Sequence, residues 1–178
     1  MKTFNNGKEF ERYFFGLGEQ EWKTERRYLS YAESILRIRS IQNRYGWNPE
    51  EPTEGTLAAE LFENVQKNLR DDYRKWLRLY ITLDTYLDWE WGTDGIFELV
   101  KPSKKVHVAI DVTLQKYKQW NAGKADYFIY VGLVSSSPTK EIYLGELGRR
   151  IASRLNQKMN TSLYSWRDLE RLTIPARS

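Results

Sequence analysis

Apolar residues recur at helical spacing in three stretches of the chain. Side chains three or four residues apart lie on one face of an α-helix, so this spacing predicts amphipathic helices near residues 28–45, 57–69 and 139–159. Their apolar stripes are Tyr28, Tyr31, Ile35 and Ile38; Leu57, Leu61, Val65 and Leu69; and Leu144, Leu147, Ile151 and Leu155. Gly16 and Gly18 predict a break between the first of these and a shorter helix that begins near Lys8. Thr53 or Thr56 is suited to cap the second.

The pattern changes between residues 95 and 134, where three short runs are rich in β-branched and aromatic residues. GIFELV (95–100), KVHVAIDVTL (105–114) and DYFIYVGLV (126–134) predict strands separated by turn residues. The segment 76–91 carries helical and strand signals together, and its state stays open. The order of elements predicts an α/β or α+β core over residues 51–178, with an N-terminal helical extension over residues 1–50.

Two aspartates interrupt the strand runs. If residues 95–114 form an antiparallel hairpin with its turn between Pro102 and Ser103, Asp94 lies opposite Asp111 and Glu98 lies opposite His107. Alternation then places Asp111, Thr113 and Gln115 on one face, and Val106, Val108, Ile110, Val112 and Leu114 on the face toward the core. The plainer alternatives are a turn aspartate before a glycine for Asp94, and a solvent-facing position on a half-exposed sheet for Asp111.

Opposed carboxylates repel each other, and a cation between them removes the conflict. The chain has no cysteine and a single histidine, so thiolate sites and sites with two histidines are excluded. The expected metal is therefore held by oxygen atoms, which favours Mg²⁺ or Mn²⁺. Asp94 and Asp111 are the predicted ligands. Glu98 is either a further ligand or the polar partner of His107, whose imidazole is expected at the surface.

The chain resembles the PD-(D/E)XK nuclease superfamily over about residues 55–158. The resemblance rests on the order of the elements: a helix, a strand preceded by Thr93-Asp94, a strand that contains Asp111, a third strand and a final helix. The resemblance implies a restriction-endonuclease-like core, with a mixed central sheet flanked by helices. It also implies a magnesium-dependent endonuclease that hydrolyses DNA phosphodiester bonds, with Asp94 and Asp111 as its two acids. Glu60 or Glu63 would stand for the acid that some members add.

One position departs from the family pattern. The family's lysine lies two residues after the second acid, where this chain has Thr113. Lys116 or Lys118 could take over the role of that lysine, because members are known to relocate it. If neither does, the alternative is a nucleic-acid-binding or protein-interaction module that kept the fold and lost the chemistry.

Basic side chains follow the predicted site. Lys116, Lys118 and Lys124 stand close to Trp120, and Arg149, Arg150 and Arg154 lie on the last predicted helix. Such residues suit a nucleic-acid backbone, but a charged hairpin tip and a solvated helix face have the same appearance. DNA is the expected partner. Because two equivalent sites match the two strands of a duplex, a homodimer is also expected.

Composition and the absence of certain motifs limit the classes of partner and of enzyme that the sequence supports. A formal charge of +4 and a pI near 9.1 are compatible with a polyanionic partner. A mean hydropathy of -0.70 and the lack of a long apolar stretch predict no membrane partner and a cytoplasmic protein. Neither a phosphate loop of the Walker type nor Gly-x-Ser-x-Gly occurs, which leaves kinase and serine hydrolase interpretations without support.

Overall fold

The computed structural model describes residues 4–18, 28–115, 125–134 and 138–161. Within them the helices are α1 (Gly7–Phe15), α2 (Tyr31–Ile41), the 3₁₀ turn η1 (Gln42–Tyr45), α3 (Leu57–Asn68), α4 (Asp71–Arg74), α5 (Tyr86–Trp91), α6 (Val131–Val134) and α7 (Thr139–Asn160). The strands are β1 (Leu77–Ile81), β2 (Gly95–Lys101), β3 (Lys104–Thr113) and β4 (Tyr127–Tyr130). The open segment 76–91 thus holds a strand and a short helix.

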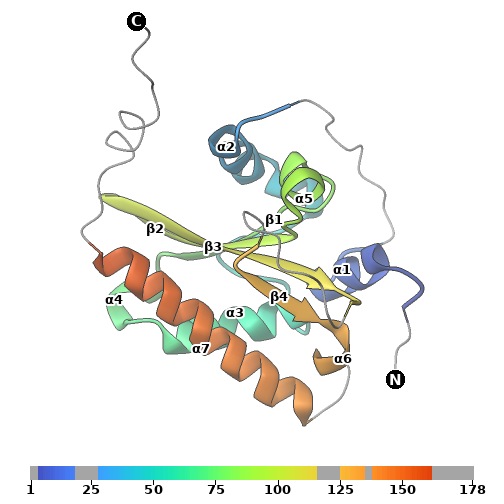
Figure 1. The fold of residues 1–178 in the computed structure, drawn as a ribbon. Coiled ribbons are helices and arrows are strands. Elements are labelled where there is room, and N and C mark those ends of the chain that lie inside the picture. Colours follow the sequence, from blue (N-terminus) through green and yellow to red (C-terminus); the bar gives the residue numbers. More distant parts are fainter. Residues whose placement is uncertain (1–3, 19–27, 116–124, 135–137, 162–178) are drawn as a thin grey trace, which may run out of the picture.

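The strands form a four-stranded mixed sheet in the order β1-β2-β3-β4. β1, β2 and β3 are antiparallel neighbours, whereas β4 runs parallel to β3. Figure 1 shows the sheet between two helical layers, with α3 and α7 on one side and α2 and α5 on the other. The predicted mixed α/β fold with a sheet flanked by helices is confirmed.

One face of the sheet packs against α3 and α7, with α1 at its end, and we call it the apolar face. Its β3 side chains are Val106, Val108, Ile110 and Val112, as the alternation predicts, and all of them are buried in the main core. Phe10, Phe14 and Phe15 of α1 join the same core and are almost fully buried. Helix α1 therefore shares the core of the elements that follow it.

The opposite face is covered by α2 and α5, and we call it the polar face. A smaller apolar cluster lies there, formed by Ile35, Ile38, Tyr80, Leu87, Ile96, Ala109 and Ala125. Buried polar side chains share this face, because Asp94 and Glu98 alternate with the strand positions that point into the main core. The interpretation of Asp111 as a solvent-facing residue is wrong, since it is only 2% exposed.

Two glycines permit close packing that a side chain would block. A Cβ at Gly95 would lie 2.9 Å from the Phe15 ring and 3.1 Å from Ile110, so the glycine lets α1 pack onto β2. A Cβ at Gly148 would lie 2.6 Å from Cβ of Asn64, so the glycine lets α7 approach α3 closely. Gly95 is paired within the sheet, and the interpretation of Asp94-Gly95 as a turn is therefore wrong.

The predicted helix boundaries hold for α3 and α7. Thr56, rather than Thr53, caps α3 by accepting a hydrogen bond from the Ala59 amide at 3.1 Å.

The third predicted strand is wrong in its second half, because the chain forms α6 from Val131 onward. The last pair of the β3–β4 ladder is Thr113 with Tyr130, and none of the described strands pairs with residues 131–134. None of the helices in the described ranges combines the length and apolar character needed to cross a bilayer.

Candidate functional site

Asp94 and Asp111 meet at the end of the sheet away from the β2–β3 turn. The ladder pairs Glu98 with His107 and Gly95 with Ile110, which confirms the predicted register and puts Asp94 opposite Asp111. The Asp94 amide donates to the Ile110 carbonyl at 2.9 Å, and the Val112 amide donates to Oδ2 of Asp94 at 2.6 Å. The Thr82 amide donates to the Asp94 carbonyl at 3.0 Å. Backbone on both sides therefore fixes the position of Asp94.

Burial makes this pair of carboxylates electrostatically unusual. Asp94 is 4% exposed, and its burial, reinforced by the negative charges of Glu11, Asp88 and Asp111, raises its pKa well above the ordinary value. The hydrogen bond from the Val112 amide acts in the opposite direction. Burial beside other acids therefore favours the protonated form of Asp94.

Two further acids approach the pair from elements far apart in the sequence. Burial raises the pKa of Asp88, on α5, from 3.8 to about 6, and Asp84 and Asp111 add to this effect. Glu11, on α1, is the strongest charged neighbour of Asp94. The sequence pattern singled out neither residue, since Glu11 has the composition of an ordinary helix face and Asp88 lay in the undecided segment.

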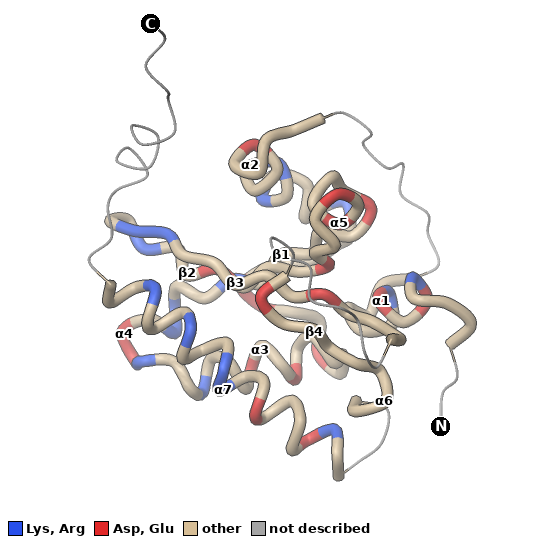
Figure 2. The backbone as a smooth tube through the Cα atoms, in the orientation of Figure 1, with Lys and Arg blue, Asp and Glu red and all other residues tan. Residues whose placement is uncertain are grey.

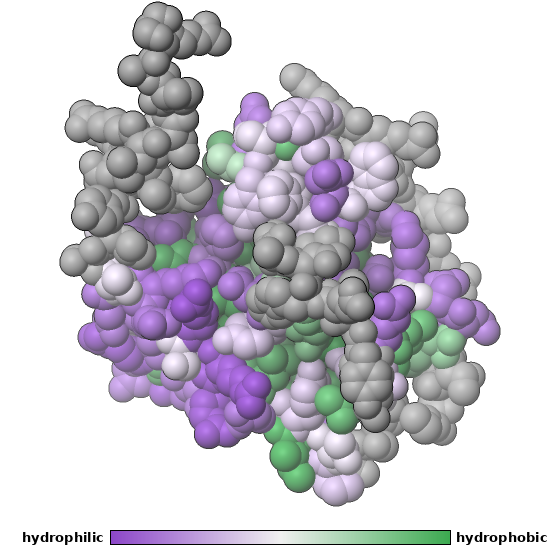
Figure 3. Space-filling view, in the orientation of Figure 1, coloured by the Kyte–Doolittle hydropathy of each residue, from purple (hydrophilic) through white to green (hydrophobic). Residues whose placement is uncertain are grey.

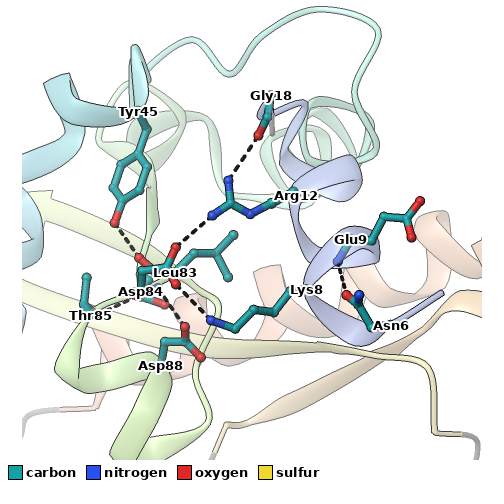
Figure 4. A network of polar contacts seen from close by, with 11 residues as sticks. Asn6, Lys8, Glu9, Arg12, Gly18, Tyr45, Leu83, Asp84, Thr85 and Asp88 are labelled. Carbon is teal, nitrogen blue, oxygen red and sulfur yellow. Dashed lines mark hydrogen bonds and ion pairs between the residues drawn. The ribbon is translucent and has the colours of Figure 1, made fainter. Parts of the chain in front are cut away.

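Basic residues of α1 reach the loop that precedes α5 (Figure 4). Lys8 Nζ lies 3.0 Å from Asp84 Oδ1, and Arg12 Nη2 lies 3.1 Å from Asp84 Oδ2. The Asp84 amide donates to Oδ2 of Asp88 at 2.7 Å. Asp84 has a φ of 58°, a left-handed conformation that aspartate adopts more readily than most residues. These contacts tie α1 to the acidic end of the sheet.

Glu98 shares the polar face with Asp94 but has a different partner. Nε of Arg39, on α2, donates to Oε2 of Glu98 at 3.1 Å, and Nη2 of Arg39 contacts Oε1. The predicted side-chain pairing of Glu98 with His107 is wrong, although the two residues are opposite in the ladder. The carboxylate of Glu98 is thus engaged by a guanidinium.

His107 belongs to the covered part of the sheet. Its Nε2 lies 2.8 Å from the hydroxyl of Tyr31, and burial, with the nearby cation of Lys158, lowers its pKa to about 4. The prediction of a surface imidazole is therefore wrong. The residue is neutral at pH 7 and forms part of the packing between α2 and the sheet.

Glu60 lies on α3 and forms an ion pair with Lys140 of α7, whose Nζ lies 2.8 Å from Oε1 of Glu60. The α3 helix packs on the apolar face, whereas Asp94 and Asp111 lie on the polar face. Among the acids whose charges raise the pKa of Asp94 are Glu11 and Asp88, and Glu60 is not one of them.

The predicted basic residues fall into two groups. Lys116, Lys118, Trp120 and Lys124 lie outside the described residues. Arg149, Arg150 and Arg154 lie exposed on α7, where the first two pair with Glu146 and the third contacts Gln157. Thr113, at the position of the family's lysine, is 7% exposed, and its hydroxyl accepts a hydrogen bond from the Gln115 amide at 3.1 Å.

In the part of the chain that the structure describes, no three His, Cys, Asp or Glu side chains are grouped so that they could hold a metal ion. Mg²⁺ nevertheless needs few protein ligands, because it keeps several waters and is bound through one or two carboxylates and the phosphates of its substrate. The oxygen atoms of Asp94 and Asp111 fit that donor set. A metal at this site would complete its coordination with water or phosphate oxygen.

Comparison of the chain with protein-family models, with curated proteins and with solved structures finds no match.

Proposed function

We propose that this protein is a metal-dependent DNA endonuclease whose site is built on Asp94 and Asp111. The observation that carries the proposal is that two buried aspartates lie opposite each other, Asp111 on β3 and Asp94 directly before β2, with Asp94 held by backbone hydrogen bonds. Burying carboxylates next to each other is costly unless a cation or a proton compensates. A divalent cation would turn that cost into a binding site.

Bound Mg²⁺ or Mn²⁺ would supply Lewis acidity, activating water and neutralising charge on a phosphodiester. Asp94 and Asp111 would hold the ion, and the Val112 amide would keep one oxygen of Asp94 oriented. Asp88 and Glu11 would strengthen the negative potential that attracts the cation. Lys116 or Lys118 stays our candidate for the lysine that orients the attacking water.

The topology is compatible with the restriction-endonuclease-like core that the sequence resembles. Helix α3 precedes the sheet, the acids lie on β3 and directly before β2, and β4 joins β3 before the chain enters α7. A homodimer remains our expectation for a nuclease that cuts both strands of a duplex.

Cleavage assays test the proposal directly. Supercoiled plasmid, linear duplex and a four-way junction are incubated with Mg²⁺ or Mn²⁺ and with wild type, Asp94→Asn or Asp111→Asn. We expect metal-dependent cutting by wild type and a loss of about 100-fold or more in each variant, since each change removes charge at the reacting centre. Asp71→Asn, at an exposed acid on α4, is the control and should cut like wild type.

The proposal fails if folded wild-type protein cuts none of these substrates, or if both site variants cut as fast as wild type. Failure to cut, with DNA binding intact and indifferent to metal, would support the alternative of a binding module on a nuclease-like fold. That alternative is favoured by Thr113, whose buried hydroxyl occupies the position of the family's lysine.

A further inference from the structure

Lysine and arginine gather where the β2–β3 turn meets the C-terminal half of α7. We call this surface the cationic end, and its residues are Lys101, Lys104, Lys105, Arg149, Arg150, Arg154 and Lys158. Figure 2 shows the basic positions on α7 and on the β2–β3 turn on the same side of the molecule, and Figure 3 shows strongly hydrophilic residues gathered there. No acid occurs in residues 99–110 or 147–161.

Hydrogen bonds hold the two segments of the cationic end together. Nζ of Lys104 donates to the carbonyls of Lys158 at 2.6 Å, Met159 at 3.1 Å and Thr161 at 2.6 Å. In return, Nζ of Lys158 donates to the carbonyl of His107 at 2.7 Å. The strand turn and the helix end are therefore fixed relative to each other, and their exposed cations form one surface.

Acidic partners neutralise only part of this charge. Glu146 pairs with both Arg149 and Arg150, whose side chains are 66% and 64% exposed. Asp72 lies 3.5 Å from Lys101, and Asp126 lies 3.8 Å from Lys158. Lys105 and Arg154 are exposed and have no acid within ion-pair distance among the described residues. The cationic end thus carries a net positive charge.

A neighbouring surface, on α3 and α4, also contains many charged residues but has no comparable excess of positive charge. On α3 and α4, Lys67 pairs with Glu63 and Arg74 pairs with Asp71. Arg70 pairs with Asp72 in the same region. Cations and acids alternate there, so the local charge is close to balanced.

We propose that the cationic end binds the phosphate backbone of duplex DNA, as a contact surface separate from the Asp94–Asp111 site. The choice of DNA rests on the proposed function, whereas the preference for a polyanion rests on the charge itself. An anionic membrane would also attract lysine and arginine, but membrane affinity is increased by apolar side chains that enter the interface beside the charges. Among the described residues, the exposed large hydrophobic side chains all lie elsewhere.

The cationic end lies far from the acidic site. Asp94 precedes β2 and Lys101 ends it, and extended chain advances about 3.3 Å per residue, so the strand carries the turn about 23 Å from the acids. One strand of duplex DNA presents a phosphate about every 3.4 Å along the axis, so this distance corresponds to about seven base pairs. Changes at the cationic end should therefore alter affinity for DNA without altering the metal site.

The test measures how DNA affinity depends on salt, in EDTA so that no cutting occurs. Fluorescence anisotropy gives Kd for two unrelated duplexes of about 20 base pairs between about 50 and 200 mM KCl, the range over which phosphate contacts weaken strongly. Wild type is compared with Lys105→Ala/Arg154→Ala, two exposed cations without ion pairs to acids. The matched control is Lys67→Ala/Arg74→Ala, two cations that have acidic partners.

We expect the slope of log K against log salt to become shallower by about 2 in Lys105→Ala/Arg154→Ala, since each phosphate contact contributes about 0.9. The loss should be the same for both duplex sequences, and the control should keep the wild-type slope. Lys105→Glu/Arg154→Glu should weaken binding further, because repulsion replaces attraction. Thermal melts confirm that each variant is folded.

The inference is overturned if Lys105→Ala/Arg154→Ala binds duplex DNA with the wild-type slope. It is also overturned if the wild type binds phosphatidylserine vesicles through these residues but does not bind duplex DNA. The two proposals fail separately. Duplex bound through the cationic end but never cut would contradict only the nuclease, and cutting with unchanged salt dependence in the variant would contradict only the cationic end.

Discussion

The two faces of the same sheet are built from different chemistry. On the apolar face, β-branched and aromatic side chains interlock with α1, α3 and α7, and the buried groups are almost entirely hydrocarbon. On the polar face, Asp94, Asp111 and Glu98 are buried beside a smaller apolar cluster, and Arg39 of α2 pairs with Glu98. Both faces pack against helices, yet the buried acids of the described sheet lie on only one of them.

The two faces therefore contribute to stability in opposite directions. Burying hydrocarbon contributes about 25 cal/mol per Å², whereas burying a carboxylate costs free energy unless a partner compensates. The apolar face can therefore support the fold and offset the cost of the acids on the other face. Acids whose pKa is perturbed by burial are frequent where proteins do chemistry.

The largest effect is expected for breaking the buried ion pair of the polar face. Arg39→Met leaves Glu98, which is 1% exposed, without its cation, and should lower the free energy of unfolding by about 3–5 kcal/mol in urea titrations. Arg39→Met/Glu98→Leu should recover most of the loss. Arg150→Met, which breaks an exposed pair, should change stability by about 0.5 kcal/mol or less. Equal losses in the two single variants would remove the distinction between buried and exposed pairs.

A comparable loss is expected on the apolar face from a cavity. Leu61→Ala, at a fully buried position of α3, should lower the free energy of unfolding by about 2–5 kcal/mol, because transfer and cavity costs add. Leu36→Ala, at a residue of α2 that is 62% exposed, should change it by less than about 0.5 kcal/mol. Similar values for the two variants would show that the core does not lie where the fold puts it.

The two faces should also differ in their response to pH. The pKa of Asp88 is about 6 in the folded protein and 3.8 ordinarily, so the folded state binds more protons between these values. Its contribution to stability is complete below about pH 4 and is lost as pH rises through about 6. Asp94, whose pKa is also raised, extends the effect to higher pH.

Asp88→Asn tests this response. Its stability relative to wild type should increase by about 1–2 kcal/mol between pH 4 and 7, measured by urea unfolding without divalent metal. Asp71→Asn, at an exposed acid, serves as the control, and its free energy of unfolding should change with pH as that of wild type does over this range. Parallel curves for Asp88→Asn and wild type would mean that burial does not perturb this acid.

The smallest effect is expected where the hairpin meets α7. Lys104→Met removes a cation that bonds to carbonyls at the helix C-terminus and should cost about 1 kcal/mol of stability in thermal melts. Lys105→Met, next to it and exposed, should cost close to nothing. If the two variants have the same melting temperature, the hydrogen bonds from Lys104 do not fix the hairpin to the helix.

Local patterns were sufficient to predict the elements with strong periodicity and the register of the central hairpin. Asp94 and Asp111 could be paired from the sequence because a short turn fixes which residues are opposite each other. Glu11 and Asp88 could not be assigned to this site from the sequence, because their distance from Asp94 depends on how α1 and α5 pack against the sheet. The partner of Glu98 was missed for the same reason, since Arg39 comes from a helix whose docking the strand pattern does not encode.

The end of the third predicted strand shows a second limit. Residues 131–134 have strand composition, but no described strand pairs with them, because the β3–β4 ladder ends at Thr113 and Tyr130. The closing of the polar face by α2 and α5 was likewise hidden, since alternation reports which side chains share a face and not what covers it.

The most direct test of the central claim is the effect of Mg²⁺ on the melting temperature of wild type and Asp111→Asn at pH 7.5, without DNA. If Asp94 and Asp111 hold a divalent cation, millimolar Mg²⁺ should raise the wild-type Tm in a concentration-dependent way, because the ion binds the folded state. Asp111→Asn should lose that rise, and Asp71→Asn should keep it. An equal Mg²⁺ response in wild type and Asp111→Asn, or none in wild type, would contradict the account.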